Sequence, residues 1–304
     1  MGETAGVSKT ITQVLQGQVG QAGTVAWVAA CAAQALETEF MLTPKPGLVD
    51  QRNCGAHYDM DLATFLASAQ AIAPWWLRFV EMGYACAKAP PVDFLGLVRP
   101  IGVGCEKAML NATRGVNTHK GAVFALGLLC SAAGRLLGQG IGLDRECVCS
   151  EVAQVCSGLV TRELSGTQAA NTAGERCFRR YGITGARGEA VSGYAAVRTV
   201  ALPVYDRLRR QGASESMALL QTLLHLMAVN SDTNLVSRGG LAGLNFVREY
   251  SRKLLREGGV LARDGLRKME AFDAELVARR LSPGGSADLL AVTWFLSRLP
   301  PTEE

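Results

Sequence analysis

The spacing of apolar residues constrains this chain more than any other feature, because it follows the helical period almost from end to end. In the segment 62–69, for example, apolar side chains recur at i, i+3, i+4 and i+7, and Asp61 stands where an N-cap would. Alternating patterns typical of strands are nearly absent, and no Asn-Gly or Asp-Gly turn lies between alternating apolar segments. The sequence therefore predicts an all-α fold, a single multi-helix globular domain with functional loops at the helix ends.

Residues 1–22, rich in Gly, Gln and Thr, are predicted to form a loose N-terminal tail, and residues 23–299 the all-helical domain. No fixed-period repeat and no linker with a shift in composition divides the chain. The predicted helices cover 25–39, 62–80 with a kink or restart at Pro74, 94–111, 119–138, 144–164, 171–181, 194–211 with an interruption near Pro203, 214–229, 240–256, 260–281 and 286–298.

Composition limits the function as well as the fold. Hydrophobic residues make up 48% of the chain and charged residues 19%, which is typical of a globular protein rather than a disordered one. The net charge is only +4, with lysines and arginines scattered along the sequence. A nucleic-acid groove would need a basic stripe with interleaved aromatic residues, so nucleic acid is not an expected partner.

The cellular compartment is indicated by three features. Nine cysteines without a CxxC pair indicate reduced thiols. The N-terminus lacks the apolar core of a signal peptide. The longest apolar runs, 24–36 and 121–137, are short or broken by Arg135, so no segment is expected to span a membrane. We therefore expect a soluble, cytoplasmic protein.

The segment 39–61 combines ionisable side chains with a stiff backbone. Pro44 and Pro46 lack backbone donors and push the residues before them into extended geometry, so the chain around them is predicted to be non-helical. A rigid, charged loop is where a site is commonly built, although a turn-rich connector with solvated charges would have the same composition. The ionisable residues used below are Glu39, Lys45, Asp50, Arg52, His57, Asp59 and Asp61.

Two further polar clusters precede or follow predicted helices and suit phosphate groups. In 112–121, two glycines allow close backbone approach, and the first-turn amides of the next helix with Lys120 would form a phosphate cradle. In 181–189, Arg187 can donate two hydrogen bonds to a phosphate. The alternative for the first cluster is an ordinary helix cap with an exposed lysine, and the second cluster is a weak signal by itself.

Two more clusters lie toward the C-terminus. In 227–240, Asp232 and Asn234 offer the oxygen ligands that magnesium prefers, although an Asx-turn cap would use the same residues. In 281–289, two glycines stand where their amides can hold an anion at a helix start. No HExxH, GxSxG or Walker lysine motif is present, so zinc peptidases, serine hydrolases and P-loop proteins are not indicated.

Taken together and in this order, the motifs resemble the triphosphoribosyl-dephospho-CoA synthase family, which makes the prosthetic-group precursor for citrate lyase and for malonate decarboxylase. The resemblance rests on E-x-x-x-T-P-K-P-G-L-V-D-x-x-N-x-G-A-H-x-D-M-D at 39–61, A-T-x-G-V-N-T-H-K-G at 112–121, R-G-E at 187–189, D-T-N at 232–234 and S-P-G-G-S-A-D-L-L at 282–290. It covers roughly residues 40–298, and the first and last motifs are long enough to be highly specific.

The resemblance implies a transfer between two nucleotides. The 2′-hydroxyl of 3′-dephospho-CoA attacks C1′ of ATP, adenine leaves, and the triphosphate stays on the transferred ribose. Such a transfer passes through an oxocarbenium-like state at C1′. It therefore needs a carboxylate as base, a hydrogen-bond donor for the purine nitrogen, and a metal with cations to hold the triphosphate. A magnesium-dependent all-helical hydrolase of a nucleotide or ribosyl bond is the alternative activity, and a catalytically silent nucleotide-binding or scaffold protein is a second alternative.

The expected roles follow from that chemistry. Glu39 or Asp50 is expected to be the base, with Glu39 preferred and Asp50 as electrostatic support, and His57 or His119 is expected to protonate adenine. Magnesium is expected on Asp232 and Asn234 with Asp59 or Asp61. The expected substrate-binding residues are Lys45, Arg52, Asn117, Lys120, Arg187, Arg238, Gly284, Gly285 and Ser286.

The expected partners are ATP and 3′-dephospho-CoA as substrates, and an apo acyl-carrier-protein transferase that receives the product. The product is the same for citrate lyase and malonate decarboxylase, so the sequence leaves the pathway open. It also leaves open the oligomeric state, a homodimer included.

Overall fold

The computed structural model of the protein describes residues 21–165 and 172–301, and every regular element within them is helical. Nearly all of the predicted tail, 1–20, lies outside the described residues. The helices are α2 (Gln21–Met41), α3 (Leu62–Ala85), α4 (Pro91–Ala112), α5 (Lys120–Gly138), α6 (Arg145–Val155), α7 (Leu159–Leu164), α8 (Ala173–Tyr181), α9 (Gly185–Val191), η1 (Val197–Ala201), α10 (Leu202–Arg210), α11 (Glu215–Val229), α12 (Thr233–Arg256), η2 (Gly259–Leu261), α13 (Gly265–Ala278) and α14 (Gly284–Ser297). The all-α prediction is confirmed for this part of the chain.

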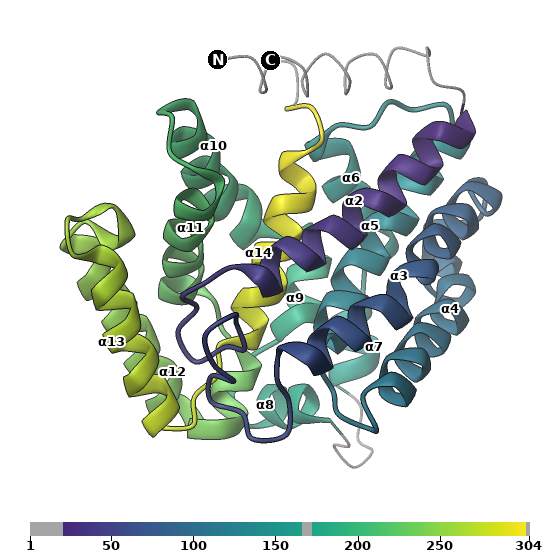
Figure 1. The fold of residues 1–304 in the computed structure, drawn as a ribbon. Helices are drawn as coiled ribbons and strands as arrows, with labels where there is room; N and C mark the ends of the chain where they lie inside the picture. Colours follow the sequence, from purple (N-terminus) through teal and green to yellow (C-terminus); the bar gives the residue numbers. More distant parts are fainter. Residues whose placement is uncertain (1–20, 166–171, 302–304) are drawn as a thin grey trace.

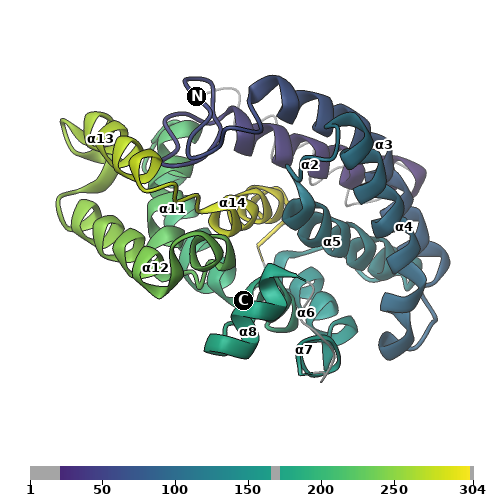
Figure 2. The same ribbon diagram turned by 90° about the horizontal axis from the view of Figure 1, so that it is seen from below.

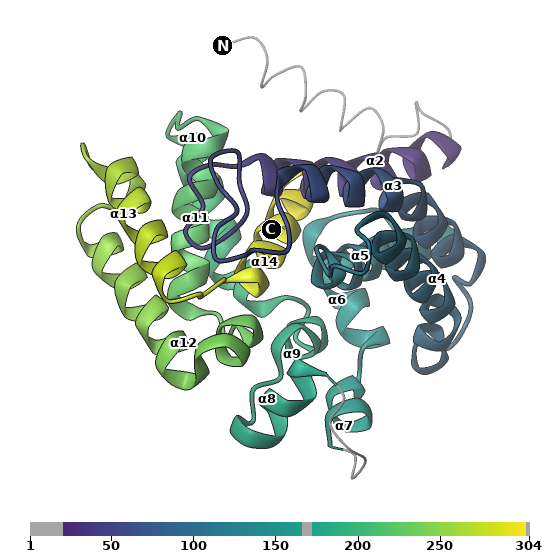
Figure 3. The ribbon, with the colours of Figure 1, turned by 60° about the horizontal axis from the view of Figure 1, so that its bottom comes forward.

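The helices form two groups on either side of α14 (Figures 1 and 2). Helices α2 to α5 pack on one another on one side, and α10 to α13 lie on the other. Helix α14 is in contact with α2 and α5 from the first group and with α11 and α12 from the second. The short helices α7, α8 and α9 lie together, with α8 against α12 (Figure 3). The N-terminal ends of α5, α12 and α14 thereby come close to the loop that follows α2.

The core is continuous through both groups, and its most buried helices are apolar on nearly all sides. Helix α5 is long and apolar enough to cross a membrane by length and composition, but most of it is buried inside the protein. It packs unusually close to α3, because a Cβ at Gly83 would lie 2.1 Å from the Ser131 carbonyl oxygen, and one at Gly134 would lie 2.0 Å from that of Val80. Burial on several sides therefore explains the apolar surface of α5.

Several predicted boundaries differ from the structure for local reasons. Pro74 does not restart its helix, since α3 runs unbroken from 62 to 85 with this proline inside it. The helix predicted at 144–164 is divided, because Gly158 adopts a left-handed φ of 73° between α6 and α7. Helix α9 was not predicted, since its seven residues contain few apolar side chains. Helix α12 begins at residue 233, seven residues before its predicted start at 240. That predicted start coincides with a kink in the observed helix, at Gly240 (φ 61°, ψ −164°).

Candidate active site

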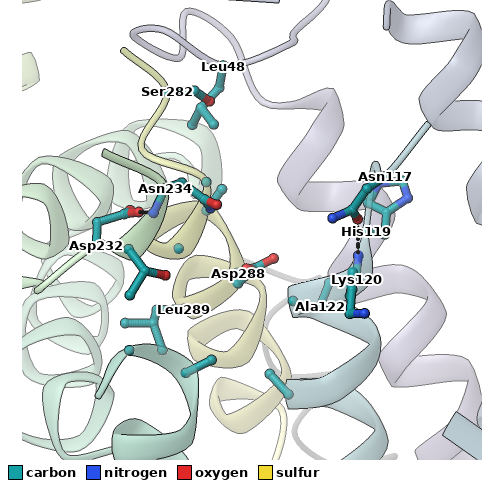
Figure 4. Close-up of a pocket in the computed structure, with 18 of the residues that line it drawn as sticks. Leu48, Asn117, His119, Lys120, Ala122, Asp232, Asn234, Ser282, Asp288 and Leu289 are labelled. Atoms are coloured by element: carbon teal, nitrogen blue, oxygen red, sulfur yellow. Dashed lines mark hydrogen bonds between the residues drawn. The ribbon is translucent and has the colours of Figure 1, made fainter. Parts of the chain in front are cut away.

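A cavity of about 650 Å³, here called the main cavity, lies where the loop after α2 meets the beginnings of several helices. Its walls come from five parts of the chain: 39–65, 117–125, 172–194, 230–238 and 282–291. Figure 4 labels side chains from four of these parts around one space, with Asp288 between Asp232 on one side and Lys120 on the other. Segments that are far apart in sequence, including all of the motifs quoted above, therefore line one space.

Asp50 organises the loop after α2 from within. Its Oδ2 accepts hydrogen bonds from Thr43 Oγ1 at 2.8 Å and from the Lys45 amide at 2.9 Å. Its Oδ1 accepts from the amides of Arg52 at 2.7 Å and Asn53 at 3.1 Å. The carboxylate is buried and is not part of the cavity wall. Asp50 thus holds the loop in shape, as a carboxylate with four donors can, and does not face the space where substrates would react.

The loop presents one ion pair to the cavity. Lys45 Nζ lies 2.5 Å from Glu39 Oε1, and the two side chains are 1% and 6% exposed. Both residues line the main cavity. Removing two charges from water is costly unless they remain paired, so the contact with Lys45 holds the Glu39 side chain in a fixed position.

Asp232 joins the start of α12 to the start of α14. As the N-cap of α12, its Oδ1 accepts from the amides of Asn234 at 3.0 Å and Leu235 at 3.4 Å. Its Oδ2 accepts from the Ser286 amide at 2.8 Å and from Ser286 Oγ at 3.1 Å. Burial raises the pKa of Asp232, while these hydrogen bonds lower it. All four lone-pair positions of the carboxylate are therefore in use.

Asp288 was not predicted as a site residue, yet it is the most electrostatically perturbed carboxyl of the cavity wall. Burial, with the nearby carboxylates of Glu39 and Asp232, raises its pKa well above the ordinary value of 3.8. A Cβ at Gly121 would lie 1.9 Å from Asp288 Oδ2, so only glycine leaves room for this carboxyl. The available sequence signal was an acidic residue inside a helix that is otherwise apolar on all sides.

Glu189 is a second residue that sequence reasoning did not select, although it belongs to the R-G-E motif. It lines the main cavity, and burial raises its pKa. Its Oε2 accepts a hydrogen bond from the Ala196 amide at 3.2 Å, which opposes that rise. The main cavity therefore has carboxyl groups on several of its walls.

His57 is held as a neutral imidazole. Arg238 Nη2 lies 3.0 Å from its Nδ1, and a guanidinium can only donate, so Nδ1 is the acceptor and Nε2 carries the proton. That Nε2 lies 2.9 Å from Ser282 Oγ, to which it donates. Burial and the charge of Arg238 lower the pKa of His57, only partly opposed by Asp59.

His119 is also neutral, for a stronger reason. Thr118 donates to Ser68 Oγ at 2.7 Å, and Ser68 in turn lies 2.7 Å from His119 Nδ1, which directs the serine proton toward that nitrogen. The proton of the ring then sits on Nε2, which is buried and has no partner among the described residues. Burial first, and Lys45 second, lower the pKa of His119 to about 3. Neither histidine is therefore an imidazolium near neutral pH.

Two of the predicted phosphate-binding cations, Lys120 and Arg187, line the main cavity and are paired with glutamates. Lys120 Nζ is 2.9 Å from Glu106 Oε2, and Arg187 Nε is 2.7 Å from Glu163 Oε2. Asn117 Oδ1 accepts from the Lys120 amide at 3.2 Å and so caps α5. All three predicted residues line the cavity.

The two glycines of the last motif are explained by close approach. A Cβ at Gly284 would lie 2.6 Å from Asn234 Nδ2, and one at Gly285 would lie 3.1 Å from Asp232 Cγ. Both glycines line the main cavity, as do Asn234, Arg238 and Asp59. They let the start of α14 pack against the start of α12.

Other predicted site residues lie away from the cavity wall. Arg52 is paired with Glu270 on the surface. Asp61 is the N-cap of α3, where its Oδ1 accepts from the Thr64 amide at 2.8 Å in a capping box. Ser286 contributes by donating to the Asp232 carboxylate, whereas Asp50 holds its own loop.

No group of three or more His, Cys, Asp or Glu side chains within the described residues is arranged to hold a metal ion. All nine cysteines are free thiols. Burial raises the pKa of several of them, as it does for Cys130 in the core. The buried thiols have the character of packed apolar side chains rather than of reactive ones, whereas Cys54 is exposed.

Comparison with known proteins agrees with the motifs. The sequence model of the family described as CitG, ATP:dephospho-CoA triphosphoribosyl transferase, matches residues 25–304. A 2-(5''-triphosphoribosyl)-3'-dephosphocoenzyme-A synthase from Klebsiella pneumoniae is 56% identical over 274 residues, which is 90% of this chain and 91% of the relative. A synthase of the same description from Escherichia fergusonii is 55% identical over 272 residues, 89% of this chain and 90% of the relative. No solved structure matches significantly.

Proposed function

The chain belongs to the ATP:dephospho-CoA triphosphoribosyl transferase family, and on that premise we propose that the main cavity is where it transfers the triphosphoribosyl group of ATP to 3′-dephospho-CoA. The observation that carries this proposal is the meeting of all five family motifs on one cavity wall. A volume of about 650 Å³ lies within the ordinary range for small-molecule sites.

The reaction has simple requirements. The 2′-oxygen of dephospho-CoA bonds to C1′ of ATP, the C1′ to purine bond breaks, and adenine leaves with the bonding electrons. The hydroxyl proton must pass to a base, and positive charge at C1′ must be stabilised as the bond breaks. The purine nitrogen gains negative charge and requires a donor.

Asp288 is our choice for the base, and Glu39 for electrostatic support. A general base works best when its pKa lies near the working pH, and the raised pKa of Asp288 brings it toward that range. Glu39 lines the cavity and is held in place by Lys45, and a fixed acidic side chain suits the stabilisation of positive charge at C1′. The expected preference for Glu39 as base is therefore revised, and Asp50 is assigned to the loop.

His119 fits the departing purine as a hydrogen-bond donor. With a pKa of about 3 it carries no transferable imidazolium proton at neutral pH, so the proton transfer expected from the sequence is replaced by donation from Nε2. Such a donor stabilises charge on the leaving nitrogen, and the free adenine anion takes its proton from water.

Magnesium is proposed to enter with ATP rather than to reside in the protein. Asp232, its main expected ligand, has all four lone-pair positions occupied by protein donors, and Asp59 is half exposed. Magnesium commonly keeps several waters and relies on substrate phosphates with one or two carboxylates. The cavity residues thus fit a metal that the triphosphate brings, and they do not form a metal cage.

One incubation separates the three candidate functions. With magnesium and ATP, adenine release that requires dephospho-CoA supports the transferase, and a product that keeps the triphosphate identifies the transferred group. Release of adenine or phosphate without dephospho-CoA would support the hydrolase instead. No turnover under either condition would leave a nucleotide-binding protein.

The wider context is also part of the proposal. We place the enzyme in the cytoplasm, since ATP is available there and since α5, the one helix among the described residues that is long and apolar enough to cross a membrane, is mostly buried in the core. A transferase acting on an apo acyl-carrier protein would receive the product. The activity of the matched family forms the precursor of the citrate lyase prosthetic group, so we propose citrate lyase as the final enzyme.

A further inference from the structure

A second cavity of about 400 Å³ lies beside the main one and has a different character. Its floor consists of buried apolar side chains from α3, α4, α5 and the start of α7. These are Phe79, Val98, Val123, Leu128 and Leu159. The two cavities meet at Lys120, Gly121, Ala186 and Arg187, which line both. Ribosyl transfer does not by itself require a second, apolar space.

We propose that the second cavity binds the pantetheine arm of 3′-dephospho-CoA, with the diphosphate of the same molecule at the junction of the two cavities. The inference rests on the proposed transferase function and specifies how the acceptor substrate is placed. The second cavity would then recognise the arm, which is the part of dephospho-CoA that ATP lacks.

The walls suit the arm chemically. A pantetheine arm is long and uncharged, with methyl and methylene groups and two amides, so most of its surface is apolar. Burying such groups against apolar side chains is favourable, and ligand sites of this kind are mostly apolar with few polar groups. A triphosphate or a charged polypeptide would lose its hydration over this floor without compensation.

The junction suits a diphosphate. Two of its residues, Lys120 and Arg187, are cations that line both cavities. The second cavity adds Arg99, Glu106 and Glu163, so that three cations face two carboxylates there. Each glutamate is bound to at least one of the cations: Glu106 to Lys120, and Glu163 to Arg99 and Arg187. Phosphate oxygens can take the place of carboxylate oxygens on the same donors.

The order of the chemical groups matches the order of the spaces. In dephospho-CoA the diphosphate stands between the adenosine and the pantetheine arm. In the structure the cationic junction stands between the main cavity and the apolar one. An arm in the second cavity would therefore place the adenosine ribose in the main cavity.

This arrangement would distinguish acceptor from donor. Both substrates are adenosine 5′-phosphates with free ribose hydroxyls, so the adenosine parts alone cannot decide which ribose attacks and which is transferred. Binding energy from the arm, far from the reacting atoms, would fix that choice.

Gly102 allows the cavity to be filled without disturbing its walls. It lies within α4 and lines the second cavity, and a Cβ built on it meets no heavy atom within 4 Å. Gly96 lies on the same helix, is equally free of neighbours and lines neither cavity. Gly102→Leu and Gly96→Leu therefore form a matched pair.

We expect Gly102→Leu to raise the KM for dephospho-CoA at least about tenfold, while the KM for ATP and all parameters of Gly96→Leu stay as in the unaltered enzyme. ADP, which has the adenosine diphosphate but no arm, serves as a probe, and its affinity should not respond to Gly102→Leu. An unchanged KM for dephospho-CoA in an active Gly102→Leu enzyme would overturn the proposal.

A measurement on the unaltered enzyme makes the test independent of folding of the variant. Isothermal titration should give dephospho-CoA at least about tenfold tighter binding than ADP. Equal affinities would overturn the arm site even if the transferase reaction is observed. Failure of dephospho-CoA to support adenine release would instead refute the proposed function.

Discussion

Replacement of Lys45 by methionine tests the buried ion pair that shapes the cavity wall. The substitution retains most of the apolar stem and removes the charge that pairs with Glu39, whose side chain is 6% exposed. Leaving one member of a buried pair without its partner costs about 3 to 5 kcal/mol, because the remaining charge is neither solvated nor paired. Against a typical total stability of about 5 to 15 kcal/mol, this loss is large.

Urea unfolding followed by circular dichroism would measure the loss. With a urea m value of roughly 3 kcal/mol/M, the single variants Lys45→Met and Glu39→Gln should each unfold about 1 M earlier than the unaltered protein. The double variant should lose less than the sum of the two, since it leaves no unpaired charge, while remaining inactive. Single variants that cost less than about 1 kcal/mol, or additive effects, would refute the buried pair and leave two solvated groups.

Three further predictions concern the same cavity. The raised pKa of Asp288 means that the folded protein binds this proton more tightly than the unfolded chain, so the free energy of unfolding should fall as pH rises from about 3.8 through the raised pKa. In a pH series of urea midpoints, Asp288→Asn should flatten this decline, and an unaltered decline would contradict the prediction. Asp232→Asn should destabilise the protein by about 1 to 3 kcal/mol through lost hydrogen bonds at two helix starts. The magnesium concentration that gives half-maximal activity should not change, and an increase in that concentration would restore Asp232 as a metal ligand. Gly121→Ala should abolish adenine release while α5 still forms, since its Cβ would lie 1.9 Å from Asp288 Oδ2, and full activity would show that this carboxyl is free to move.

The helical architecture was predictable because apolar periodicity extends over many residues. Helix α11 agrees with its predicted boundaries within one residue, since a Ser cap and a long apolar run mark it. Helix α9 was not found, because its short glycine-rich sequence forms a helix only in contact with α5, α6 and α7. Tertiary contacts, which the sequence does not display, decide such cases.

The candidate site was predictable as a set of loops, but not as a set of roles. Asp50 and Asp61 have the residue type of a catalytic or metal-binding group, yet their carboxylates satisfy backbone amides of their own loop and helix. The reverse holds for Asp288, which reads as one polar residue in an apolar helix and gains its raised pKa from residues distant in sequence. Side-chain direction and neighbouring charge assign such roles, and neither follows from spacing alone.

A pH profile of single-turnover adenine release tests most directly whether Asp288 activates the acceptor hydroxyl in the main cavity. The base must be deprotonated, so the rate in the unaltered enzyme should rise with pH through the raised pKa of Asp288. Asp288→Asn, with ATP binding checked separately, should be slower by at least about a hundredfold and should lack this rise. An Asp288→Asn enzyme that released adenine at the unaltered rate, with the same dependence on pH, would contradict the account.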